Sequence, residues 1–114
     1  MEKIQDRTKR FALEIIKFAN GFPRNMTAYV LGKQIIRSAT SVGANYRAAQ
    51  RARSRSEFIA KLGIVLEEAD ETVYWLEMIT ESALVSAERS APLLKEANEI
   101  TAIIVSSLKT AKAK

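Results

Sequence analysis

The sequence predicts an all-α protein, built as an antiparallel up-down-up-down four-helix bundle. Helix-favouring residues such as Ala, Leu, Ile, Glu, Lys and Arg are abundant, whereas the 114 residues include only four Gly and two Pro. Four stretches repeat apolar residues at helical spacing, and the connections between them are short, as expected for antiparallel neighbours in a bundle. Residues 1–114 are therefore predicted to form a single four-helix-bundle domain.

The first helix is expected from about Glu2 to Asn20, and Gly21 and Pro23 end it. Its core-facing side has apolar residues at helical spacing. Additional apolar residues widen this side beyond what one partner helix needs, which predicts burial both in the bundle and against another subunit. They are Ala12, Leu13, Ile16 and Ala19.

The second helix is expected from near Asn25 or Thr27, either of which can cap it, to about Arg53. Beside its apolar face lies a seam of small or amide side chains, which would let a neighbouring helix approach closely and form hydrogen bonds across the gap. The seam consists of Gln34, Ser38, Ser41 and Asn45. A third face is a basic stripe of Lys33, Arg37, Arg47 and Arg51.

The remaining two helices follow from capping signals. Ser54 and Glu57 have capping-box spacing, which predicts a very short turn and a third helix that runs to about Leu84. Ser86 or Ser90 is expected to cap the fourth helix. The basic tail, residues 109–114, lacks large apolar side chains and is expected to fray.

The amino-acid composition excludes or disfavours several classes of function. The chain has no Cys and no His, which excludes disulfides, thiolate metal sites and the usual neutral-pH acid or base. Without a membrane-spanning apolar run or a signal-peptide core, a cytoplasmic location is expected. No catalytic residue, metal site or cofactor is predicted. The acidic stretch 67–71 could in principle hold a hard metal ion, but an exposed or interhelical pairing face is the favoured interpretation.

Charge is distributed very unevenly along the chain. Residues 25–55 include six basic residues and no acid, whereas residues 56–88 include eight acids and only one basic residue, Lys61. If the second and third helices form a hairpin, Arg37 and Lys33 lie opposite Glu67, Asp70 and Glu71 and are expected to be neutralised.

Near the turn of this hairpin, the basic residues have only Glu57 close by, so uncompensated charge is expected there. Clustered Arg and Lys bind phosphate oxygens well, so these residues are candidates for contact with RNA or DNA. A merely solvated or subunit-bridging basic end is the alternative. Tyr46 and Phe58 are expected in the core, so any binding would be directed to the phosphate backbone. The candidates are Arg47, Arg51, Arg53, Arg55 and Lys61.

Residues 31–76 carry a family resemblance. The matching words include Gly32-Lys33-Gln34, Ser41-Val-Gly-Ala-Asn45-Tyr46, Gln50-Arg-Ala-Arg53, Glu68-Ala-Asp-Glu71 and Trp75-Leu76. This stretch resembles the small four-helix-bundle proteins known as 23S rRNA-intervening-sequence (S23-like) proteins. The resemblance implies a protomer that assembles into a ring-shaped homo-oligomer, a homopentamer. Ala48 and Glu67 depart from the family pattern, in which Glu and Lys are more often expected.

Two functional hypotheses follow. The first is a non-enzymatic, ring-forming helical protein whose basic end contacts RNA or DNA phosphates. The second is a structural or adaptor oligomer that recognises a protein partner without nucleic acid. Neither hypothesis involves a membrane or a small-molecule substrate.

Overall fold

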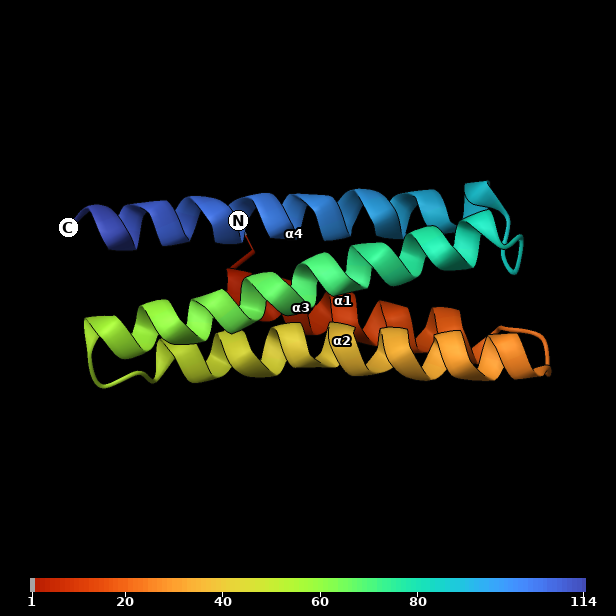
Figure 1. Ribbon diagram of the computed structural model, residues 1–114, viewed down its shortest axis with the longest axis horizontal. Helices are drawn as coiled ribbons and strands as arrows, with labels where there is room; N and C mark the ends of the chain where they lie inside the picture. The colour runs from red at the N-terminus through yellow and green to blue at the C-terminus, as the bar shows by residue number, and fades with distance from the viewer. Residues whose placement is uncertain (1) are drawn as a thin grey trace.

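The computed structural model describes residues 2–114, which form four helices lying side by side in a rod of 47 × 22 × 20 Å (Figure 1). The helices are α1 (Ile4–Asn20), α2 (Met26–Gln50), α3 (Arg55–Glu81) and α4 (Ala87–Ala113). Consecutive helices run in opposite directions along the rod. The prediction of an all-α, up-down-up-down four-helix bundle is confirmed.

Side-chain caps fix where three of the helices begin. The side-chain oxygens of Asn25, Ser54 and Ser86 each accept a hydrogen bond from the backbone N–H three residues further on, at 2.8, 3.1 and 3.2 Å. Each bond satisfies a donor that the first turn of a helix otherwise leaves unpaired. The cap at Ser54 is as predicted. Of the alternatives offered for the other two helices, Asn25 and not Thr27 caps α2, and Ser86 and not Ser90 caps α4.

Two helix ends come earlier than predicted. The second helix ends at Gln50 and not near Arg53, because the chain needs the intervening residues to reverse before Ser54 adopts its extended capping conformation. The third helix ends at Glu81 and not at Leu84. There Ala83 adopts a left-handed conformation with φ of 62°, and the Leu84 N–H bonds to the Ile79 carbonyl at 3.2 Å, closing the helix with a Schellman-type turn.

The expectation that the C-terminal tail frays is wrong. Helix α4 continues to Ala113, close to the end of the chain. Its last turn is supported by α3, because Arg55 Nε donates a hydrogen bond to the carbonyl oxygen of Ala111 at 2.8 Å. This contact joins residues 56 positions apart in sequence, so local composition gave no sign of it.

The polar seam of α2 faces a neighbouring helix, as predicted, and that helix is α3. Ser38 and Thr72 are fully buried, and their hydroxyl oxygens lie 2.9 Å apart. One turn further along, the Ser41 hydroxyl donates to the Glu68 carboxylate at 2.8 Å. Asn45 instead bonds within its own helix, to Ser41. Around this seam the core is apolar, with Ile35, Leu62, Leu76, Ile79 and Ile104 among its fully buried side chains.

Helix α1 is the shortest, with 17 residues against 25 in α2 and 27 in each of α3 and α4. In Figure 1 it begins part of the way along the rod, so one end is built from α2, α3 and α4 alone. The α2–α3 connection and the C-terminus both lie at this three-helix end.

Candidate nucleic-acid interface

The three-helix end collects the basic residues that the sequence singled out. Arg47 lies in the last turn of α2, Arg51 caps its C-terminus, Arg53 lies in the connection and Arg55 begins α3. All four are exposed, whereas Lys61, in the second turn of α3, is half-buried. The hairpin geometry therefore brings five cations from 15 residues of sequence to one end of the molecule.

None of these five side chains is paired with an acid within residues 2–114. Across residues 2–114, every ion pair within 4.0 Å involves Arg7, Arg10 or Arg37. The nearby acid, Glu57, accepts a bond at 3.4 Å from the backbone N–H of Arg53, not from its guanidinium group. Arg55 uses only its Nε on the Ala111 carbonyl, which leaves its two terminal nitrogens for another acceptor.

The middle of the same hairpin is different. Arg37 binds Glu68, with oxygens 3.3 Å from Nη1, and also binds Glu71 through Nη2. The hydrogen bond from Arg37 holds the pKa of the Glu71 carboxyl below its ordinary value, and the same contact raises the pKa of Arg37. Glu71 is thus a correct prediction, but Glu68 takes the place expected for Glu67 or Asp70.

The expectation that Lys33 is neutralised by acids of the third helix is wrong. Its ammonium group lies 6.0 Å from the centre of the Tyr29 ring on its own helix and has no carboxylate within ion-pair distance in the described chain. Residues 29 and 33 are one turn apart on the exposed face of α2, so the lysine lies near an aromatic ring of its own helix.

A further cationic cluster joins α1 to α4. Arg7 donates to both carboxylate oxygens of Glu96 at 2.7 Å and to Glu99 at 2.7 Å, and Arg10 pairs with Glu2, Glu14 and Glu96. The bond from Arg7 lowers the pKa of Glu96. These arginines hold two helices together and are already engaged by acids, so they are poor candidates for phosphate contact.

Sequence reasoning missed the contribution of α4. Residues 100–114 carry Lys109, Lys112 and Lys114 and no acid, and the straight helix takes them to the three-helix end. Lysines near a helix C-terminus are favoured by the helix dipole. The predicted topology already implied this placement, because in an up-down-up-down bundle the end of the fourth helix lies beside the turn between the second and third helices.

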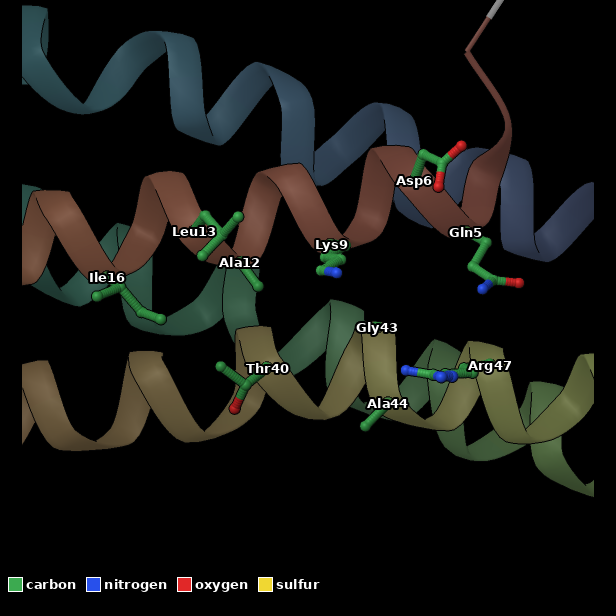
Figure 2. Close-up of a pocket in the computed structure, with 10 residues that line it drawn as sticks. All are labelled: Gln5, Asp6, Lys9, Ala12, Leu13, Ile16, Thr40, Gly43, Ala44 and Arg47. Atoms are coloured by element: carbon green, nitrogen blue, oxygen red, sulfur yellow. The ribbon is translucent and has the colours of Figure 1, made fainter.

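Two hollows adjoin this basic surface. One, of about 400 Å³, lies between α1 and α2 and is shown in Figure 2. Lys9 and Leu13 of α1 face Ala44 and Arg47 of α2 across it. Asp6 also lines this hollow but makes no ion pair there.

The second hollow, also of about 400 Å³, lies between the start of α3 and the end of α4. Arg55 and Lys114 supply cations to it, and Phe58 supplies an aromatic ring that is only partly buried. Sequence reasoning placed Phe58 in the buried stripe of the third helix. Phe58 does pack against the core, but it is only partly buried and it borders this hollow, because α1 begins too late to cover this end of the bundle.

The structure adds little in favour of metal chemistry. Among residues 2–114, no three acidic side chains converge as a metal-binding group, and the acids of stretch 67–71 are divided between Arg37 and the outer surface of α3. In the same part of the chain, no helix combines the length and apolar character needed to cross a membrane.

The fold and this surface define a class: a four-helix-bundle protein with one end dominated by unpaired basic side chains. Comparison with known proteins gives the family. Residues 2–106 match the family described as 23S rRNA-intervening sequence protein, and the chain belongs to that family.

A solved relative supports this assignment. The chain is similar to a protein of unknown function from the S23 ribosomal protein family of Bacteroides thetaiotaomicron VPI-5482, known from its crystal structure. The two are 36% identical, with a TM-score of 0.88, over 94% of this chain and 99% of the relative. A search of curated proteins gives no match.

Proposed function

We propose that this protein binds the phosphate backbone of RNA or DNA through its three-helix end and performs no catalysis. The observation that carries the proposal is the contrast in charge pairing. Arg37 in the middle of the hairpin, and Arg7 and Arg10 between α1 and α4, are held by acids. In the described part of the chain, no acid pairs with the basic residues of the three-helix end, which are Arg47, Arg51, Arg53, Arg55 and Lys61. Such cations release condensed counterions from a nucleic acid when they bind its phosphates.

Arginine suits this role because its planar guanidinium group can donate two parallel hydrogen bonds to one phosphate. The folded backbone already fixes the positions from which these side chains extend, so little backbone entropy is lost on binding. Nothing in the fold offers a helix or ribbon shaped to read base edges in a duplex groove, so the binding expected is not sequence-specific.

We also propose that the protein acts as a ring-shaped homo-oligomer, with five subunits as the family resemblance implies. Two outer surfaces support self-association because both expose large apolar side chains. On α3, the exposed Ile64 and Tyr74 lie beside Glu67 and Asp70. Between α1 and α2, the 52%-exposed Leu13 lies in a hollow that Ile16 and Lys9 also line.

When one surface of a chain binds a different surface of an identical chain, the contact repeats from subunit to subunit. The subunits form a closed ring if the rotation between neighbours adds up to a full turn. Several copies of the basic end would then act together and strengthen a weak individual contact. Light scattering should give a mass of five times the 12.7 kDa protomer mass. A monomer would contradict this part of the proposal.

The experiment for the nucleic-acid proposal compares two triple variants. In the first, Arg47, Arg51 and Arg55 are replaced by Ala. In the second, Lys17, Arg24 and Lys33 are replaced by Ala, which removes the same charge from the other half of the rod. Fluorescence anisotropy with a labelled single-stranded RNA at 0.1 M salt should show about 100-fold weaker binding for the first variant only. Equal losses would mean that net charge, not the three-helix end, governs binding.

The adaptor alternative has its own supporting observation. At the opposite end of the rod, Met26 is 82% exposed and Tyr29 is 69% exposed, beside a shallow hollow that Phe22 and Pro23 also line. Large exposed apolar side chains of this kind are common at protein-binding surfaces. Capture of a protein partner that persists at high salt, with no binding of nucleic acid, would favour the adaptor function.

A further inference from the structure

The hollow between α3 and α4 has a composition that differs from the rest of the basic surface. Its lining residues include the aromatic Phe58 and the hydroxyl-bearing Ser106, Ser107 and Thr110. Arg55 and Lys114 also line it, and none of its lining residues in the described chain is an Asp or Glu. An aromatic ring, groups that both donate and accept hydrogen bonds, and neighbouring cations together suit a planar, polar, aromatic group that is attached to an anion.

We infer that this hollow receives an unpaired base of a single-stranded nucleic acid, which stacks against Phe58 while the adjoining phosphate lies near Arg55 and Lys114. The inference rests on the proposed function and makes it more specific, because it identifies single strands as the ligand. A duplex keeps its bases stacked inside the helix, whereas a single strand can present a base face.

The fold explains why this aromatic ring is available. Phe58 lies on the core-facing side of α3, in its first turn. The start of α3 belongs to the three-helix end, which α1 does not reach (Figure 1). At other levels, side chains of α1 such as Phe11 and Ile15 fill the corresponding space and are fully buried. Phe58 also has no aromatic partner in residues 2–114, where the two close ring pairs are Phe18 with Phe22 and Tyr74 with Trp75.

Arg55 is held in a position that suits the role. Its Nε bonds to the Ala111 carbonyl at 2.8 Å, so the guanidinium group is fixed against the end of α4 at the edge of the hollow. The terminal nitrogens are free to donate to a phosphate. Because this anchoring exists before binding, less side-chain entropy is lost when the nucleic acid is bound.

The test uses the unmodified protein and three oligonucleotides of equal length: a single-stranded oligothymidine, an abasic strand with the same phosphates, and a blunt duplex. Stacking predicts that the base-containing strand binds about 10-fold more tightly than the abasic strand. It also predicts tighter binding of that strand than of the duplex. Equal affinity for the base-containing and abasic strands would overturn the inference but leave the phosphate proposal intact. Failure of all three to bind would overturn both.

A pair of variants locates the effect. Phe58→Leu keeps an apolar side chain but removes the aromatic face, so it should bring the affinity ratio of base-containing to abasic strand close to one. Binding of the abasic strand itself should not change. Phe22→Leu removes a partly buried ring at the opposite end and should leave the ratio unaltered. A ratio that is unchanged in folded Phe58→Leu protein, with folding verified by circular dichroism, would exclude Phe58 as the stacking ring.

Discussion

The middle and the turn end of the α2–α3 hairpin use the same residue types for different purposes. In the middle, Arg37 meets Glu68 and Glu71, and Ser41 donates to the same Glu68 carboxylate. At the turn end, Arg47 and Arg51 lie on the same helix without an acid to bind in the described chain. The difference arises because the acids of α3 are concentrated after Glu67, well beyond the turn.

A row of basic residues on a helix indicates a binding surface for phosphates only where neighbouring helices do not supply acids that pair with it. The sequence shows a continuous stripe on α2, and the structure divides it into a part that stabilises the hairpin and a part that remains available. Net charge alone does not reveal this division. The predictions below test it, beginning with the change that should have the largest effect.

Introducing acids beside the arginines at the turn end of the hairpin should neutralise them, as Glu68 and Glu71 neutralise Arg37 in the middle. In the double variant Ala44→Glu with Ala48→Glu, each new carboxylate lies three residues before an arginine, Arg47 or Arg51, and is placed to pair with it. Affinity for a single-stranded RNA at 0.1 M salt should fall by about 20-fold, although every arginine is still present. The matched control, Ala44→Gln with Ala48→Gln, should bind as the unmodified protein does. Equal binding by the Glu and Gln variants would show that these arginines do not contact phosphate.

Removing Arg37, which is paired with acids, should lower the stability of the protein and leave its affinity for RNA nearly unchanged. Arg37→Ala should lower the free energy of unfolding by about 0.5–1 kcal/mol, because a partly exposed arginine that binds two carboxylates is lost. Urea unfolding measures this change. The affinity for RNA should change by less than about twofold, since Arg37 is already neutralised inside the protomer. A large loss of affinity with no change in stability would reverse the roles assigned to the two regions.

The contribution of Arg37 to stability should also depend on pH. The folded-state pKa of Glu71 is lowered from a reference value of 4.5, chiefly by the hydrogen bond from Arg37. The stabilisation is therefore fully present above about pH 4.5 and is lost as the pH falls through the lower folded-state value. The stability difference between the unmodified protein and Arg37→Ala should shrink between pH 6 and about pH 3. A difference that stays constant over this range would show that the ion pair contributes nothing.

Much of the fold could be predicted from sequence because its determinants are local. Apolar spacing fixes the four helices, and Asn25, Ser54 and Ser86 fix three of the starts. The close approach of a neighbouring helix to the α2 seam was also predictable from its small polar side chains, but the identity of that helix, α3, was not. The Ser38–Thr72 pair is the clearest outcome of that prediction.

The parts that were missed depend on contacts between distant segments. The stability of the last turn of α4 depends on Arg55, which lies far away in sequence. The exposure of Phe58 depends on where α1 begins relative to α3, and helix periodicity does not give this register. Likewise, helical spacing alone does not specify which acid of α3 lies within reach of Arg37, and in the structure Glu68 does.

The most direct test of the central claim is the salt dependence of binding to single-stranded RNA. The magnitude of the slope of log K against log salt concentration should fall by about two when Arg47, Arg51 and Arg55 are replaced by Ala, since each phosphate contact contributes about 0.7. The Lys17, Arg24 and Lys33 triple variant should keep the slope of the unmodified protein. Identical slopes for all three proteins would contradict the claim that the unpaired arginines of the three-helix end contact the phosphates.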